Sequence, residues 1–244
     1  MSTRGKTIKY ESPQAQTLLR PMITRRFELV ANHETCCGCG TCAKICPREA
    51  ITMSEPVLVA GRVEAKPRVD IDPATCSFCG ECVALCPTHS LAMTVNGQEE
   101  LPVQKAEAFP YLIRRVAVDQ AVLAATRDVA YIDNCPRGAI SADVARSAAG
   151  EVTAVQNVAI DRGKCVNCTH CMEEGPQGGF TITKPYRGRA ALDVSLCPAG
   201  CQACVDVCPS RALTYDGARV LLDERFCLYC EACVAVCPAE GAVR

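Results

Sequence analysis

Short stretches in which apolar and polar residues alternate flank the cysteine-rich parts of this chain. Their period of two is that of half-buried β-strands. These stretches are RFELV (26–30), AITM (50–53), RVDID (68–72), SLAMTV (90–95) and RAALDV (189–194). Apolar triplets inside the cysteine runs predict single helical turns, namely AKI (43–45), VAL (83–85), VDV (205–207) and VAV (234–236). Strands and helices this short predict an α+β fold built from small repeated units.

The cysteines recur at fixed spacing. The chain has 244 residues and 21 cysteines. Three runs have the spacing C-x2-C-x2-C-x3-C, one run has three residues in its first gap, and proline follows the last cysteine of each. The runs are Cys36, Cys39, Cys42 and Cys46; Cys76, Cys79, Cys82 and Cys86; Cys227, Cys230, Cys233 and Cys237; and the variant Cys197, Cys201, Cys204 and Cys208. This spacing resembles that of bacterial-type ferredoxins, in which the fourth cysteine ligates the other cluster of a pair.

A chain so rich in cysteine could also contain a disulfide framework or structural zinc sites. A secreted disulfide protein is disfavoured because the cysteine count is odd and no apolar signal segment follows Arg25 and Arg26. Zinc sites use two C-x2-C pairs with a longer spacer, which leaves the third and fourth cysteines of each run without a role. We therefore expect iron-sulfur ligands in a protein of the reducing cytoplasm.

Cys135 stands alone in the segment NCPRGAI, but its position is informative. A further run, Cys165, Cys168 and Cys171, has a glycine where its fourth cysteine is expected. The interval from Cys135 to Cys165 equals that from Cys46 to Cys76, so Cys135 corresponds to Cys46. The four ligand positions of the other cluster in this copy hold Ala125, Asp128, Tyr131 and Gly175. The middle unit is thus predicted to keep one cluster and to have lost the other.

Two alternatives concern this middle unit. Cys135 could be a buried free thiol, which would leave a three-iron cluster on the other three cysteines. His170, between two of the cysteines, could coordinate iron, although a solvated loop histidine is the simpler expectation.

Twenty of the 21 cysteines then form five sets of four, each expected to hold a [4Fe-4S] cluster, and Cys37 is left as a buried free thiol. Site 1 is Cys36, Cys39, Cys42 and Cys86; site 2 is Cys46, Cys76, Cys79 and Cys82; site 3 is Cys135, Cys165, Cys168 and Cys171; site 4 is Cys197, Cys201, Cys204 and Cys237; site 5 is Cys208, Cys227, Cys230 and Cys233.

The repeats predict tandem ferredoxin-like units of the bacterial 2[4Fe-4S] type. The expected parts are an N-terminal basic arm (1–28), a two-cluster unit (29–98), a connector (99–113), a one-cluster unit (114–188) and a two-cluster unit (189–244). Because almost no connector separates the last two units, we expect compact packing, with site 3 near a cluster of each neighbour. The arm is either a solvated tail or a segment that packs on an acidic partner. Its basic residues are Arg4, Lys6, Lys9, Arg20, Arg25 and Arg26.

Other functional classes have little support in the sequence. The formal net charge of −1 gives no basic footprint for nucleic acid. No run approaches the roughly 18 apolar residues of a membrane span. Neither a G-x-G-x-x-G motif after a strand nor a P-loop is found, so we expect an electron-transfer subunit with no catalytic residues.

The sequence resembles the polyferredoxins, and most closely the polyferredoxin subunit of archaeal formylmethanofuran dehydrogenase. The segments that carry this resemblance are GQEELPVQKAEAFPYLI (97–113) and FTITKPYRGRAALDVSLCPAGCQACVDVCP (180–209). The resemblance implies anaerobic methanogenesis, with electrons passed from a heterodisulfide reductase or hydrogenase to a tungsten or molybdenum enzyme that reduces CO2. The family pattern of eight clusters in four units is not met here. A freely diffusing electron carrier or store, or a subunit of a hydrogenase system, remains the alternative.

Overall fold

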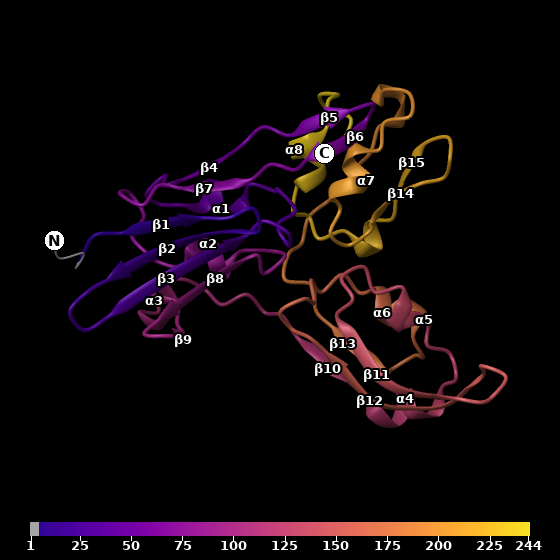
Figure 1. Cartoon of the computed structure of the whole chain (residues 1–244). Helices are drawn as coiled ribbons and strands as arrows, with labels where there is room; N and C mark the ends of the chain where they lie inside the picture. The colour runs from indigo at the N-terminus through magenta and orange to yellow at the C-terminus, as the bar shows by residue number, and fades with distance from the viewer. Residues whose placement is uncertain (1–4) are drawn as a thin grey trace.

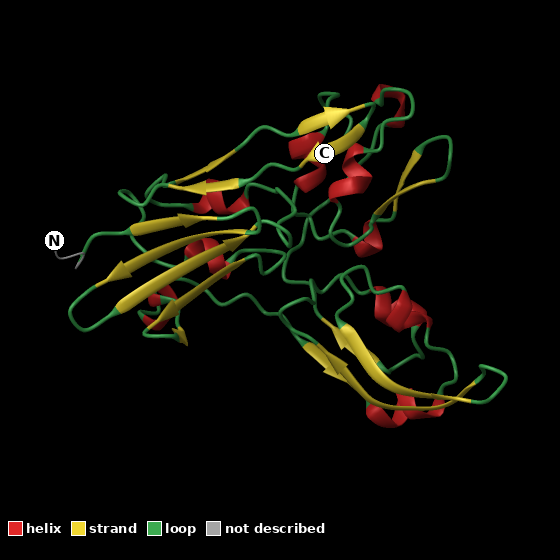
Figure 2. Ribbon diagram, viewed as in Figure 1, coloured by secondary structure: helices red, strands yellow, loops and turns green. Residues whose placement is uncertain are grey.

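The computed structural model describes residues 5–244, which form three groups of short strands and helices (Figures 1 and 2). We name these groups, in chain order, the first, middle and third units, and they converge near the centre of the view in Figure 1. Within residues 5–244, no helix has the length and apolar character needed to cross a membrane. Arg4 lies outside the described residues.

An antiparallel five-stranded sheet forms one side of the first unit. Its strands are, in spatial order, β1 (Ile8–Glu11), β2 (Ala15–Pro21), β3 (Arg26–Asn32), β8 (Leu91–Val95) and β9 (Gln98–Glu99). The alternating segments RFELV and SLAMTV are the neighbouring strands β3 and β8, in register from Phe27 opposite Val95 to Ala31 opposite Leu91. The pattern of period two therefore predicted these strands correctly.

The expectation of a separate N-terminal arm is wrong for the described residues. β1 and β2 are part of the first unit's sheet, and Leu18 on β2 is fully buried opposite Leu29 on β3. The buried Gln16 side chain accepts a hydrogen bond from the Ile71 backbone N–H at 2.8 Å. Gln16 and Leu18 lie two residues apart and so face the same side of β2, which gives this strand an inward face.

Two pairs of strands and three short helices make up the rest of the first unit and its connector. β4 (Ile51–Met53) pairs with β7 (Val69–Ile71), and β5 (Val57–Val59) forms a hairpin with β6 (Arg62–Ala65). The helices are α1 (Thr41–Ile45) and α2 (Glu81–Ala84), at the predicted positions inside the cysteine runs, and α3 (Pro102–Lys105) in the expected connector. The connector is tied to this unit, since the Val103 N–H donates to the Cys79 carbonyl at 3.0 Å.

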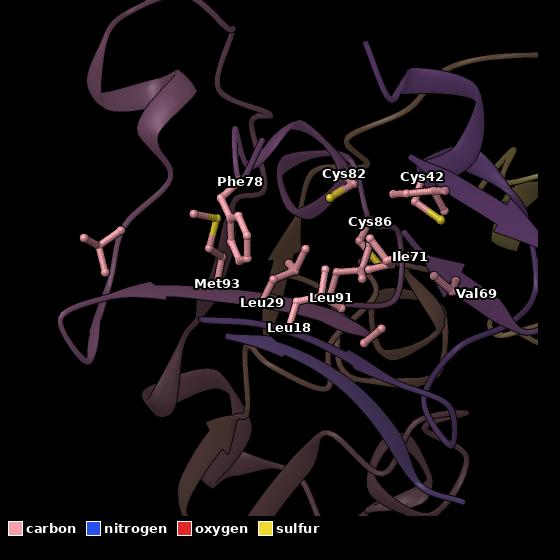
Figure 3. Close-up of a cluster of buried hydrophobic side chains, with 13 residues drawn as sticks. Leu18, Leu29, Cys42, Val69, Ile71, Phe78, Cys82, Cys86, Leu91 and Met93 are labelled. Carbon is pink, nitrogen blue, oxygen red and sulfur yellow. The ribbon is translucent and has the colours of Figure 1, made fainter. Parts of the chain in front are cut away.

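The core of the first unit contains the side chains of ligand candidates. Figure 3 shows Leu18, Leu29, Leu91 and Met93 of the sheet facing the helical layer. Cys42, Cys82 and Cys86 belong to the same buried cluster (Figure 3). A bound inorganic group would therefore be part of the core.

The middle unit repeats a smaller version of this plan. β10 (Val116–Val118) pairs with β13 (Phe180–Ile182), and β11 (Ile140–Arg146) pairs with the long β12 (Val152–Ile160). Its helices are α4 (Gln120–Ala125), α5 (Ala130–Asp133) and α6 (His170–Glu174). Asp119 caps α4 by accepting from the Ala121 and Val122 N–H groups, as expected of an N-cap aspartate.

The third unit is the smallest. β14 (Leu213–Tyr215) pairs with β15 (Val220–Leu222), and the helices are α7 (Ala203–Val207) and α8 (Ala232–Val236). Two 3-10 turns, Val194–Leu196 and Glu224–Phe226, precede its cysteine runs. The predicted strand RAALDV is wrong: it contains only one bridge, Leu192 to Val243, and then enters the first turn, which the Asp193 side chain caps.

All three units share one arrangement. Each has an outer pairing of its first and last segments (β3 with β8, β10 with β13, Leu192 with Val243), an inner pair of strands, and two contacting helices. The helix pairs are α1 with α2, α5 with α6, and α7 with α8. Short strands and short helices are the small elements that the sequence predicted.

Candidate metal centres

The structure groups the candidate cysteines around small cavities. One cavity is lined by the four cysteines of site 1, a second by those of site 2, a third by those of site 3 and a larger one by those of site 5. At site 4, Cys197, Cys201 and Cys237 lie near Cys204, where burial, together with their negative charge as thiolates, raises the pKa of the Cys204 thiol to about 12.

The loop after the first cysteine of a run has the same backbone conformation in four of the five runs. The residue two positions after the first cysteine has positive φ in Gly38, Phe78, Asn167 and Tyr229. Its N–H group points back at the first sulfur, at 3.4 Å from Gly38 to Cys36 and 3.3 Å from Tyr229 to Cys227. The residue after the second cysteine is also left-handed: Gly40, Gly80, Thr169 and Glu231. These left-handed residues wrap the chain around one point. Only the run with the longer first gap departs, because Gln202 has a φ of −129°.

The cysteine that precedes proline has its own recurring contact. The Ala50 N–H donates to the Cys46 sulfur at 3.3 Å, and the Ser90 N–H donates to the Cys86 sulfur at 3.2 Å. The isolated Cys135 receives the same bond from Ala139 at 3.3 Å. Its local geometry is therefore that of the fourth cysteine of a run, which favours a ligand over an unrelated free thiol.

The third cysteine of each run is enclosed by its short helix. Burial raises the pKa of the thiol to about 12 in each of Cys42, Cys171, Cys204 and Cys233. Metal binding requires the thiolate, so cations are needed to hold these sulfurs in their charged form. Iron in the cavity and nearby basic side chains would both supply positive charge.

Basic side chains do approach the ligand loops, a feature that the spacing of cysteines did not predict. The shared feature is a cation that donates to the backbone carbonyl of a candidate ligand, at distances of 2.7 to 3.0 Å. The pairs are Lys66 with Cys36, Arg20 with Cys76, Arg114 with Cys86 and Lys184 with Cys227. Arg20 comes from the segment expected to be an arm, and its guanidinium also lies 4.7 Å from the centre of the Phe78 ring.

The sulfurs surround cavities instead of converging on one point. Among residues 5–244, no group of three His, Cys, Asp or Glu side chains is close enough to hold a single metal ion. A cubane with iron at four corners needs its four thiolates spread around a larger body. The cavities ringed by cysteines therefore fit such a group.

Aromatic packing fills the place of the second cluster predicted to be missing from the middle unit. Tyr131 stands where a ligand would be and is 1% exposed. Its ring packs edge-on against Phe180 with the centroids 5.1 Å apart. A Cβ atom on Gly175, the fourth missing ligand position, would lie 2.9 Å from the Phe180 ring. These contacts leave a packed apolar core with Leu123 and Val155.

His170 is not the solvated loop histidine that was expected. It is the first residue of α6, and its side chain is only 13% exposed. The ring stacks on Phe226 of the third unit at 3.6 Å between centroids, and Nε2 lies 2.8 Å from the Ser210 carbonyl oxygen. His170 thus joins the middle and third units, a role that only the tertiary structure reveals.

Sites 1, 3 and 5 lie at the contacts between units. Arg114, which donates to the Cys86 carbonyl, also contacts the ring of His89, and Arg137 reaches the Thr35 carbonyl at 3.5 Å. Val166 and Cys168 of the middle unit pack against Leu228 and Cys230 of the third. The packing is compact, and site 3 adjoins both neighbouring units.

Cys37, the cysteine left outside the five sets, is buried as expected. It packs among residues of the third unit, in the same cluster of side chains as Cys39 and Cys230. Hydrogen bonding to Cys230 and Cys39, with burial, holds the pKa of the Cys37 thiol well above its usual value.

Comparisons with known proteins agree with this geometry. A family model described as a 4Fe-4S dicluster domain matches residues 35–90 and 196–241. An uncharacterized ferredoxin of Methanocaldococcus jannaschii is 35% identical over 57 residues, which are 23% of this chain and 73% of that relative. A chain in the solved formate dehydrogenase - heterodisulfide reductase - formylmethanofuran dehydrogenase complex from Methanospirillum hungatei matches with a TM-score of 0.81 at 28% identity. That match covers 100% of this chain and 85% of the other.

The two segments matched by the family model contain the four complete cysteine runs. The match to the solved chain extends over all the units. Small strands, short helices and cysteine-lined cavities are thus combined in ferredoxin-type domains that bind 4Fe-4S clusters for electron transfer. The chain therefore belongs to the ferredoxin family and is a polyferredoxin.

Proposed function

We propose that this polyferredoxin is an electron-transfer subunit that holds five [4Fe-4S] clusters and passes electrons between redox enzymes of one complex. The observation that carries the proposal is the grouping of twenty cysteines in five sets of four within a fold that the Methanospirillum hungatei chain shares over the whole length of this chain. Each cluster, when bound, accepts or releases one electron.

The residues of the chain have three tasks in this function. The twenty cysteines of sites 1 to 5 supply the thiolates. Backbone N–H groups such as those of Gly38, Ala50 and Ala139 donate to the sulfurs and favour their charged form. Lys66, Arg20, Arg114 and Lys184 place positive charge beside the ligand loops and so offset the negative charge of reduced clusters.

The proposed units are those expected from the sequence, as tandem bacterial-type ferredoxin domains, with the N-terminal strands β1 and β2 added to the first unit. The middle unit holds one cluster because Tyr131 and Phe180 occupy the place of the other. No catalytic residues are assigned. The proposed location is the cytoplasm.

The proposed partners are enzymes of the kind in the matched complex, namely formylmethanofuran dehydrogenase with heterodisulfide reductase or formate dehydrogenase. The test is anaerobic purification of the tagged full-length chain from its native cells, followed by identification of the copurifying proteins. We expect these redox subunits in stoichiometric amount. A hydrogenase in their place would reject this partner assignment, and a chain that purifies without any partner would favour a free electron carrier.

Iron analysis tests the cluster count independently. Five cubes predict about 20 iron atoms per chain. Cys135→Ser removes one ligand of site 3. We expect each chain to lose between one and about four iron atoms, because only the site 3 cluster loses a ligand. Cys37→Ser is the matched control and should leave the iron content unchanged. Unchanged iron in Cys135→Ser, or stoichiometric zinc in the wild type, would contradict the proposed ligand sets.

A further inference from the structure

One cysteine run has an extra residue in its first gap, and the loop that this residue lengthens lies on the surface. The run begins at Cys197 and continues at Cys201, with the segment PAG (198–200) between them. All three residues of this segment are exposed. In the other four runs, the residue two positions after the first cysteine is buried or partly buried. The longer gap therefore leaves the ligand loop of site 4 open to the surroundings.

This loop is part of an exposed apolar surface. Val194 and Leu196, in the 3-10 turn before Cys197, are 42% and 49% exposed. With Pro198 and Ala199 they form a surface that we call the site 4 patch, and it surrounds Cys197 in the chain. The patch lies at the outer end of the third unit, beside the tip of the β5–β6 hairpin (Figure 1). Contiguous exposed apolar side chains of this kind typically mark an interaction site.

The corresponding loop of site 2 is covered by other parts of the first unit. Phe78 in this loop is 2% exposed, and the Arg20 guanidinium donates to the Cys76 carbonyl at 2.7 Å. The connector also lies against the loop, since a Cβ atom on Gly80 would be 3.1 Å from the Leu101 side chain. Compared with site 2, site 4 is therefore more open to the approach of a redox protein.

The charges near the patch favour a partner with a basic rim. The four basic side chains that donate to ligand carbonyls serve sites 1, 2 and 5. At site 4, Asp193 immediately precedes the patch, and the exposed Glu240 follows the candidate ligand Cys237 by three residues. Arg244 lies near Asp193 and offsets part of its charge. The four thiolates of a bound cluster add further negative charge, so the surface as a whole complements positive charge.

We propose that the site 4 patch is the docking surface for a redox protein whose own cofactor lies behind an apolar face with a basic rim. The inference rests on the proposed function, because it requires a cluster at site 4. Docking covers the patch and brings the partner's cofactor to the side of Cys197. One electron then passes between the cluster and that cofactor, so that one is oxidised and the other reduced. No covalent bond forms or breaks, and no proton is transferred.

The first test measures electron transfer to a basic mitochondrial cytochrome c, which serves as the probe for such a partner. The holoprotein is reduced with dithionite, freed of the excess by gel filtration and mixed with ferric cytochrome c in a stopped-flow spectrometer. Each reduced cluster gives one electron to one ferric haem. Attraction between opposite charges accelerates the encounter and is screened by salt. We therefore expect the second-order rate constant of the wild type to fall as the salt concentration rises.

A matched pair of double variants isolates the apolar contact. Val194→Ser/Leu196→Ser removes the two large side chains of the patch. Val57→Ser/Leu221→Ser removes a valine and a leucine of similar exposure, 47% and 40%, from the β5–β6 and β14–β15 hairpins. We expect the rate constant to fall about tenfold in the first variant and to stay unchanged in the second, with the iron content of both equal to that of the wild type. Equal rate constants in the two variants overturn the inference.

A charge-reversal pair tests the same surface with every apolar side chain in place. Glu240→Lys should lower the rate constant about threefold at low salt, because it repels the basic probe. The difference should vanish at about 0.5 M salt, where exposed charges are screened. Glu151→Lys makes the same charge change at an exposed residue before β12 of the middle unit and should have no effect. Equal rate constants in Glu240→Lys and Glu151→Lys overturn the inference.

The remaining outcomes separate this inference from the proposed function. A wild type that is dimeric in analytical ultracentrifugation, and monomeric as Val194→Ser/Leu196→Ser, would assign the patch to a second copy of this chain and overturn the inference. An iron content well below about 20 per chain, with rates that still depend on the patch, would show that the cluster count is wrong and the docking surface right. Full iron content with insensitive rates would leave the clusters in place and reject only the docking surface.

Discussion

At the scale of single residues, the electrostatic surroundings of each ligand loop differ although the cysteine spacing is nearly constant. Lys66 donates to the Cys36 carbonyl at 2.7 Å, whereas at site 4 burial and the negative charges of Cys237, Cys201 and Asp193 raise the pKa of the Cys197 thiol. Negative charge added on reduction is stabilised by a nearby cation. Equivalent cysteine runs can therefore hold clusters of different potential.

Lys66→Gln tests this electrostatic role at site 1. Removing the positive charge should lower the potential of one cluster by roughly 20 to 60 mV, which is up to a tenfold change in its reduced fraction. The measurement is a redox titration followed by electron paramagnetic resonance. Arg146→Gln removes a charge at the end of β11, where Arg146 contacts the Gly150 carbonyl, and should leave every potential unchanged. Equal effects of the two variants would contradict the assignment.

His89 gives a prediction about pH. Burial, with the adjacent Arg114, lowers the pKa of His89 to about 4. The unfolded chain, with a histidine pKa near 6.5, binds the proton first as the pH falls. The contribution of neutral His89 to the free energy of unfolding is therefore fully present above about pH 6.5 and is lost as the pH falls toward 4. We expect cluster absorbance at pH 5 to decay severalfold faster than at pH 7, and His89→Gln to reduce this ratio. The same ratio in both proteins would argue against His89 as a contributor.

At the scale of secondary structure elements, short hairpins join the units as well as support the clusters. The turn between β5 and β6 places Gly61 beside Cys201, where a Cβ atom would lie 2.8 Å from the Cys201 Cα. Gly61 also has a φ of +76°, which disfavours any other residue. This glycine therefore permits the close contact between the first and third units.

Gly61→Ala and Gly97→Ala form a matched pair that isolates the contact. Both glycines have positive φ, +76° and +79°, so alanine costs about 1 kcal/mol in backbone strain at either position. Within the described part of the chain, Gly97 has no atom within 4 Å of its added Cβ, so only Gly61→Ala collides with the third unit. We expect hydrogen exchange of the Gln202 amide, which donates to the Gly61 carbonyl, to accelerate only in Gly61→Ala. Equal exchange rates of the Gln202 amide in both variants would show that the contact between the first and third units does not depend on the close packing of Gly61 against Cys201.

At the scale of the whole molecule, each of the three units is too small to fold alone. The iron-sulfur clusters form part of the core of these units. The chain contains only five Phe, six Tyr and no Trp. Residues 5–244 contain five groups of packed hydrophobic side chains. Four of these groups include candidate ligand cysteines from two or more of the iron-sulfur sites. Units of this size bury little apolar surface and depend on metal binding for folding free energy. The middle unit differs, because Tyr131 and Phe180 pack in an apolar core where a second set of cysteines is absent from the sequence.

Removal of iron should therefore unfold the protein unevenly. We expect the first and third units of the iron-free chain to lose most of their secondary structure, and the β11–β12 hairpin of the middle unit to keep the most residual protection. Circular dichroism measures the total loss, and hydrogen exchange compares β11–β12 with β14–β15. An iron-free protein with native circular dichroism would contradict the dependence on clusters. Equal protection in the two hairpins would contradict the role given to the aromatic core.

Features that depend on local geometry could be predicted from the amino-acid sequence alone. The apolar triplet between the third and fourth cysteines of each complete run predicted helices α1, α2, α7 and α8, and the proline after each run ends the helical turn. The repeated interval also predicted a fourth-ligand role for Cys135, whose sulfur receives the same backbone hydrogen bond as Cys46 and Cys86.

The contacts between segments that are distant in the chain could be learned only from the folded structure. The N-terminal residues 8–21 look like a basic tail, but Gln16 and Leu18 bury one face of β2 in the first sheet. His170 looks like a loop residue, but Phe226 of another unit covers its ring. Cys37 looks like a spare thiol, but the contact between the first and third units sets it beside Cys39 and Cys230. These roles come from contacts between residues far apart in the chain, and local spacing carries no information about such contacts.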